Sequence, residues 1–282
     1  MNVILTIRRI IMLPLVILTL ITTPAAVSTE TAELLSTHTF VFEQALMMGQ
    51  GITNDGEYYY TSGSITAVNS QTLAKFDMNM DLVDVNFNPL PKKCRQRGNN
   101  HIGGISYYNG KIYAPVEGGD EVPACIVVFD AETLEAENVY DLPASDYPDG
   151  VPWCAVDSET GYLYASVWAQ TKKIHVYDVN DGMKYVKTVE LSEPVKRIQG
   201  GEFYEGTLYL SKDNNDKGKI RDILSVNVAT GEVNLAAERN IGSENFEAEG
   251  MTFTEGENGP VLHVLDYNKN IGIFLHHYDV GF

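Results

Sequence analysis

One histidine and several carboxylates lie where short strands of this 282-residue sequence are expected to begin or end. His101, Glu117 and Glu249 are the candidate catalytic residues, because two carboxylates and a histidine can exchange protons with a bound substrate. Glu117, Glu249 and Asp266 offer a different chemistry, since carboxylate oxygens are the ligands that Ca²⁺ prefers. The sequence therefore predicts either acid–base catalysis or a calcium site, and it has no motif for a nucleotide or organic cofactor.

Amide, cationic and aromatic side chains at equivalent positions could bind a ligand. Two tryptophans among them could form a wall against an apolar or cationic group. The candidate ligand-binding residues are Gln50, Asn100, Trp153, Trp168, Arg197, Gln199 and Lys212.

Some of these residues have a purely structural alternative. His101 could cap a turn, Glu117 could be a solvated loop acid, and Trp153 could pack inside the protein. Glu202 lies within a predicted strand, where it could pair with Arg197 or with a lysine ten residues later in the sequence. The sequence alone leaves these alternatives open.

A repeat of about 50 residues must position these side chains. Each copy has a small-residue strand, a turn and an aromatic strand, and four of the five turns contain a glycine, which favours a tight hairpin. A third strand then ends in a residue that can start a turn. These end residues are Asp77, Asp130, Asp178, Asn227 and Asp279. A fourth strand follows, so the repeat predicts blades of four antiparallel strands.

Five copies fill the chain, which predicts an all-β, five-bladed β-propeller. The fifth copy stops after its third strand, and an unassigned strand at residues 37–46 precedes the first copy. We expect this N-terminal strand to complete the last blade, because closure removes an open sheet edge. A six-bladed ring with one degenerate blade is the alternative. Candidate ligands should bind where loops enter the innermost strands and follow the second strands.

The N-terminus has the pattern of a secretory signal peptide. Arg8 and Arg9 precede an apolar stretch at residues 10–21, and small residues follow up to Ala26. The apolar stretch is shorter than the roughly 20 residues of a membrane span, although an uncleaved anchor is the alternative. We expect a signal peptide at 1–26, a short lead at 27–36 and one domain at 37–282. The predicted protein is secreted or extracytoplasmic, monomeric, and free of the membrane after cleavage.

The formal net charge of −18 limits the classes of partner. A strongly acidic protein repels phosphate backbones, so we expect no nucleic-acid binding. The charge favours a cationic or polar small ligand, and solubility alone is the simpler explanation of it.

Three cysteines in an exported protein predict one disulfide. Cys94 enters the second blade, and Cys125 follows the loop after that blade's second strand, so both belong to one face. We expect these two to pair and Cys154 to be buried and free. Three free thiols are the alternative.

Residues 50–56, Gln-Gly-Ile-Thr-Asn-Asp-Gly, lead to residues 60–64, Tyr-Thr-Ser-Gly-Ser. This stretch resembles the first blade of the plant and bacterial glutamine cyclotransferases, which are exported five-bladed propellers that cyclise N-terminal glutamine. Residues 102–105, Ile-Gly-Gly-Ile, lack the family's second-blade Glu, and residues 198–202 depart from its fourth-blade motif. The resemblance implies the fold and an enzyme of the hydrolase or cyclotransferase type. A non-catalytic propeller that binds a small ligand, sugar or protein is the alternative.

Overall fold

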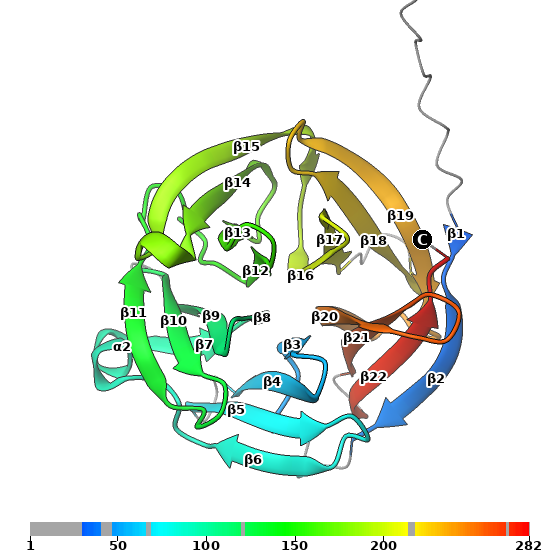
Figure 1. Ribbon diagram of the computed structural model, residues 1–282, viewed down its shortest axis with the longest axis horizontal. Helices are drawn as coiled ribbons and strands as arrows, with labels where there is room; N and C mark the ends of the chain where they lie inside the picture. Colours follow the sequence, from blue (N-terminus) through cyan, green and yellow to red (C-terminus); the bar gives the residue numbers. More distant parts are fainter. Residues whose placement is uncertain are drawn as a thin grey trace, which may run out of the picture.

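The computed structural model describes residues 30–40, 47–65, 69–119, 122–213, 218–268 and 271–281. Five antiparallel sheets stand around one axis like the blades of a propeller (Figure 1). The predicted all-β, five-bladed fold is therefore confirmed. The signal-peptide prediction falls outside the described residues. Within them, no helix has the length and apolar character needed to cross a membrane.

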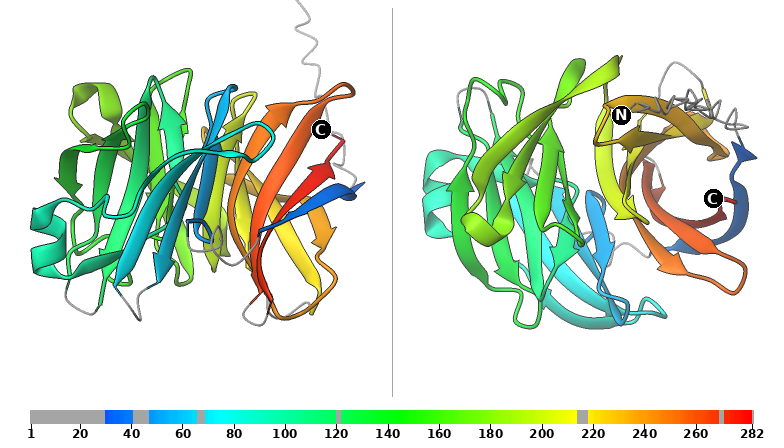
Figure 2. Two further views of the ribbon diagram at one scale, coloured as in Figure 1. Left: turned by 90° about the horizontal axis from the view of Figure 1, so that it is seen from below. Right: turned by 45° about the horizontal axis from the view of Figure 1, so that its top comes forward.

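Each blade places its first strand at the axis and its last strand on the outside (Figures 1 and 2). Blade 1 contains β3 (Gly51–Asn54), β4 (Tyr58–Ile65), β5 (Ser70–Asp77) and β6 (Leu82–Asn86). Blade 2 contains β7 (Asn99–Ile102), β8 (Ser106–Tyr108), β9 (Lys111–Gly118), β10 (Cys125–Asp130) and β11 (Ala136–Asp141). Its innermost strand is interrupted, since β7 and β8 both pair with β9. A short helix, α2 (Lys92–Arg97), leads into it.

The remaining blades are more regular. Blade 3 contains β12 (Trp153–Asp157), β13 (Tyr162–Ser166), β14 (Thr171–Asp178) and β15 (Lys184–Val195), with the 3-10 turn η2 (Val179–Asp181) before β15. Blade 4 contains β16 (Ile198–Tyr204), β17 (Thr207–Lys212), β18 (Ile220–Asn227) and β19 (Glu232–Asn240). Blade 5 contains β20 (Phe246–Glu255), β21 (Pro260–Asn268), β22 (Gly272–Asp279) and the N-terminal strand β2 (Glu33–Thr39).

The turn residues act as the repeat predicts. All five predicted end residues are the last residues of third strands, and each accepts a backbone N–H with its side chain. Asp130, for example, accepts from the N–H groups of Glu132 at 3.1 Å and Thr133 at 2.9 Å. The hairpin glycine of blade 1, Gly56, has a φ of +88°, which most other residues avoid.

The N-terminal segment closes the ring. β2 pairs antiparallel with β22, from Glu33 opposite Asp279 to Thr39 opposite Phe274, so the predicted closure is confirmed. The strand begins earlier than residue 37, and residues 41–46 lie outside the described part of the chain. A short strand before it, β1 (Glu30–Thr31), pairs parallel with β19 of blade 4. Residues 30–36, which the sequence assigns to a short N-terminal lead, therefore join the outer edges of blades 4 and 5.

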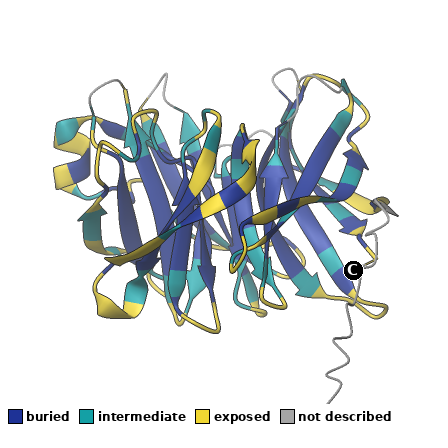
Figure 3. Cartoon of the chain, turned by 90° about the horizontal axis from the view of Figure 1, so that it is seen from above, coloured by how far each residue is buried: buried dark blue, intermediate teal, exposed yellow. Residues whose placement is uncertain are grey.

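The hydrophobic core is divided among the interfaces between blades. Buried residues lie along the strands, and many exposed residues lie in the turns (Figure 3). The interface of blades 5 and 1, for example, buries Phe40, Phe76 and Leu275. Trp153 of blade 3 packs with Leu210 of blade 4 at the interface of those blades. Because every cluster joins two neighbouring blades, only a closed ring buries all five interfaces.

Glycines let the innermost strands meet at the axis. A Cβ atom on Gly200 would lie 2.8 Å from the Cα of Gly250, and one on Gly250 would lie 2.6 Å from the Cα of Gly51. A Cβ on Gly104 would likewise lie 2.6 Å from the carbonyl oxygen of Gln199. Backbone therefore fills the axis at this level and separates the two faces of the ring.

The thiols of Cys94 and Cys125 lie side by side between α2 and β10. All three cysteines are buried and are present as thiols, so a disulfide is not formed in this structure. A hydrogen bond with Cys125 lowers the pKa of the Cys94 thiol to about 7, against the effect of burial, and the charges of Arg97 and Lys93 lower it further. The same contact raises the pKa of Cys125.

We expect these two thiols to form a disulfide under oxidising conditions. The bond would close a loop of about 30 residues and stabilise the fold by about 3–4 kcal/mol. Peptide mapping without reduction should find Cys94 linked to Cys125 and Cys154 free. A link to Cys154, or three free thiols after oxidation, would contradict this prediction.

Candidate functional site

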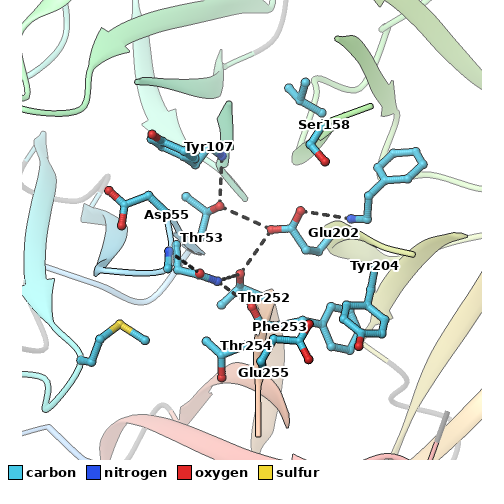
Figure 4. A pocket seen from close by; sticks show the side chains of 15 residues that line it. Thr53, Asp55, Tyr107, Ser158, Glu202, Tyr204, Thr252, Phe253, Thr254 and Glu255 are labelled. Carbon is cyan, nitrogen blue, oxygen red and sulfur yellow. Dashed lines mark hydrogen bonds between the residues drawn. The ribbon is translucent and has the colours of Figure 1, made fainter. Parts of the chain in front are cut away.

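A pocket of about 550 Å³ opens at the axis, on the face where the first and second strands of each blade are joined by hairpins (Figure 4). All five blades contribute to its wall, for example through Thr53, Tyr107, Ser158, Glu202 and Thr252. This is the opposite end of the innermost strands from the loops that the sequence indicated. A concave site with converging polar groups is the usual form of a small-molecule site.

The carboxyl group of Glu202 lies at the bottom of this pocket. It comes from β16 two residues after Gly200, and Thr53 and Thr252 stand two residues after Gly51 and Gly250 in their strands. Side chains two residues apart in a strand share a face, so these three point to the same axis that the glycines close. The glycine layer forms the floor, and the Thr–Glu–Thr layer lies directly on it.

Three hydrogen bonds hold the carboxyl group of Glu202 in place. The hydroxyl groups of Thr53 and Thr252 donate to Oε2 at 3.4 Å and 3.3 Å, and the backbone N–H of Phe203 donates to Oε1 at 3.0 Å. The threonines are fixed in turn, because Thr53 accepts from the N–H of Tyr107 at 3.0 Å and Thr252 accepts from the amide of Asn54 at 2.7 Å. The carboxyl is thus oriented directly by blades 1 and 5, and blade 2 acts through Thr53 (Figure 4).

Burial sets the protonation of Glu202. Removal from bulk water raises the pKa of its carboxyl to about 7, although the three hydrogen bonds act in the opposite direction. The side chain is partly exposed, and it faces the pocket. A carboxyl group with such a pKa can both donate and accept a proton near neutral pH, which is the property of a general acid–base catalyst.

The structure also decides the alternative that the sequence left open for Glu202. Glu202 does not pair with Arg197 or Lys212, because Arg197 binds Asp213 and Lys212 lies 3.7 Å from Asp222. The sequence did contain a signal for its position. Aligned on the axial glycines, Glu202 occupies the same place as the threonines of blades 1 and 5.

The predicted catalytic and metal residues lie on the other face, in two separate groups. In blade 2, Nδ1 of His101 lies 3.1 Å from Oε1 of Glu117, whose Oε2 accepts from the N–H of Val151 at 2.7 Å. In blade 5, Asp266 and Glu249 are buried.

Asp266 is neutralised by protein groups rather than open to a metal. Arg239 donates to both of its oxygens, at 2.9 Å and 3.2 Å, and Nδ1 of His276 lies 2.7 Å from Oδ2. Burial raises the pKa of Glu249, and the nearby charge of Glu247 adds to the effect. No group of three His, Cys, Asp or Glu side chains in the described parts of the chain is arranged to hold a metal ion. The Ca²⁺ site stays a prediction.

The predicted ligand-binding residues are spread over the same face. The guanidinium of Arg197 stacks 4.7 Å from the ring of the half-exposed Trp168 and also binds Asp213. Trp153 is fully buried, and its indole N–H donates to Ser166 at 3.1 Å.

The amide residues of this set make short-range contacts with nearby parts of the chain. The side chain of Gln50 donates to the carbonyl of Gly49, and the carbonyl of Asn100 accepts from Gln71. Gln199 is partly buried beside the axial glycines. The structure does not gather the seven residues around a cavity, and their roles stay predictions.

No protein-family model matches the sequence, and no curated protein matches it. Among solved structures, the fold is similar to an exo-β-1,3-galactanase from Clostridium thermocellum, with 13% identity and a TM-score of 0.54 over 81% of this chain and 58% of that one. It is also similar to a luciferin-regenerating enzyme, with 12% identity and a TM-score of 0.50 over 81% and 75% of the two chains. The chain spans less than two thirds of the galactanase. At these identities the likeness shows the propeller fold alone, in a set of neighbours that includes enzymes.

Proposed function

We propose that this protein is an extracytoplasmic propeller enzyme that carries out acid–base chemistry on a small polar molecule in the hairpin-face pocket. The observation that carries the proposal is the carboxyl group of Glu202. It lies at the bottom of a cavity formed by all five blades, and burial raises its pKa to about 7. General acid–base catalysis contributes typically about 10²–10⁴-fold to a rate when the group titrates near the working pH.

The hydrolase or cyclotransferase type of reaction suits this arrangement, because both need a proton to move to or from a heteroatom. Glu202 would deliver or remove that proton, and Thr53 and Thr252 would hold its carboxyl in position. The hydroxyl of Ser158 and the backbone of the hairpins offer further polar contacts at the wall. Export is inferred from the N-terminal sequence pattern.

An activity screen with purified protein tests the proposal. The panel should include β-galactosides, lactones and peptides with N-terminal glutamine. We expect turnover of at least one class, with a rate that changes around about pH 7 and falls about 10²-fold or more in Glu202→Gln. Equal turnover by the Glu202→Gln variant would contradict the role of this residue. Binding of panel compounds without turnover would favour the non-catalytic alternative.

A further inference from the structure

The ionisable side chains of the pocket wall are acidic. Its lining includes three carboxyl groups, from Asp55, Glu202 and Glu255, and no lysine, arginine or histidine. None of the three carboxyl groups makes an ion pair with a basic side chain anywhere in the described parts of the chain. Within the described residues, the carboxyl groups of the cavity therefore have no basic ion-pair partner.

Aromatic rings and a thioether complete the same wall. Tyr204 and Phe253 lie with ring centroids 5.2 Å apart, on one side of the cavity. Tyr107 lies on another side and is held parallel to Tyr60, with 5.8 Å between centroids. Met78 contributes a polarizable sulfur. Aromatic faces attract cations through their negative quadrupole, so rings and carboxylates favour the same kind of ligand.

The two rim carboxylates, Asp55 and Glu255, come from blades 1 and 5. Asp55 accepts from two backbone N–H groups of its own turn and from the hydroxyl of Tyr60 at 2.8 Å. Glu255 is exposed and lies in the pocket lining with Tyr204. Both carboxyl groups line the pocket together with the aromatic side chains (Figure 4).

We infer that the substrate carries an ammonium group, which binds between the aromatic wall and the rim carboxylates while its reacting part faces Glu202. This deepens the proposed function and rests on it for the reaction, but not for the binding. An anionic molecule would be repelled by the three carboxyl groups, and a neutral sugar would hydrogen-bond them without the added attraction between opposite charges.

Matched pairs of cationic and neutral probes test this inference by titration calorimetry. Phenethylamine is compared with 2-phenylethanol, and choline with its neutral isostere 3,3-dimethylbutan-1-ol, at about pH 8, where carboxylates are ionised. We expect each ammonium probe to bind at least about tenfold more tightly than its neutral partner, with an advantage that shrinks in high salt.

The rim variant Glu255→Gln should weaken the ammonium probes about three- to tenfold and leave the neutral probes unchanged. Glu257→Gln is the matched control, because this exposed glutamate lies in the same β20–β21 turn but outside the pocket lining. It should change neither class of probe.

Equal affinity within each pair, preference for the neutral probe, or no binding of either ammonium compound at millimolar concentration would overturn the inference. These outcomes are separable from the test of the reaction. If the ammonium probes bind selectively but Glu202→Gln turns over as fast as the wild type, the acid–base role fails and the cation site remains. If Glu202→Gln loses activity on a neutral substrate, the acid–base role stands and the inferred ammonium substrate fails.

Discussion

A chain that begins at Met47, without the ring-closing strand, should show no cooperative unfolding transition. It lacks β2, which pairs with β22 from Phe274 to Asp279, and it lacks Phe40, which is buried between blades 5 and 1. The loss should be comparable with the roughly 5–15 kcal/mol that stabilises a typical domain, because an open ring exposes both a strand edge and a blade interface.

The matched control is a chain that begins at Val27 and keeps β1 and β2. It should unfold cooperatively in a thermal melt followed by circular dichroism. A synthetic peptide of residues 27–46 added to the shortened chain should restore part of that transition by pairing with β22. Phe40→Ala offers a milder variant, with an expected cost of about 3–5 kcal/mol. If the chain from Met47 melts like the chain from Val27, the closure does not stabilise the ring.

Glu202→Gln should make the protein more stable at alkaline pH while it removes activity. The folded state raises the pKa of this carboxyl to about 7, whereas an unfolded chain titrates near its ordinary value. The stabilising effect of the protonated form is complete below about pH 4.5 and is lost as the pH rises through about 7. An amide cannot ionise, so the stability of the variant does not fall in this way as the pH rises.

We therefore expect Glu202→Gln to exceed the wild type by about 1–3 kcal/mol at about pH 8, and to differ little from it at about pH 4.5. Chemical denaturation at the two pH values measures the difference, and Glu257→Gln provides a control outside the pocket. A variant that is several kcal/mol less stable at both pH values would show that Glu202 holds the inner strands together and is not a strained catalytic group.

The sequence contained most of the fold because the repeat is encoded locally. Asp77 and its four counterparts mark the ends of third strands through side chain to backbone bonds that need no distant partner. The interruption of the innermost strand in blade 2 was not predictable in this way. At this break the backbone of Gly104 bonds to blade 3, where its N–H donates to Pro152 and its carbonyl accepts from Cys154, and these residues are far from it in the sequence.

The candidate site was harder to predict, because its defining property is burial. Glu202 in the sequence is one of many acids, and its raised pKa comes from burial in the closed ring, which the hydrogen bonds from two threonines of other blades oppose. Conversely, Asp266 carries the residue type of a metal ligand, but Arg239 and His276 occupy its oxygens. Residue types therefore indicated which chemistry a side chain could perform, but not which neighbouring side chains bind it in the folded protein.

Titration of the Glu202 carboxyl group is the most direct test of the proposed site. Carboxyl ¹³C chemical shifts of labelled protein, compared between the wild type and Glu202→Gln, identify the signal that belongs to this residue. The arrangement at the bottom of the pocket predicts an apparent pKa of about 7. A value near that of an ordinary solvated glutamate, about 4.3, would contradict it, because the carboxyl would then be ionised and unable to donate a proton near neutral pH.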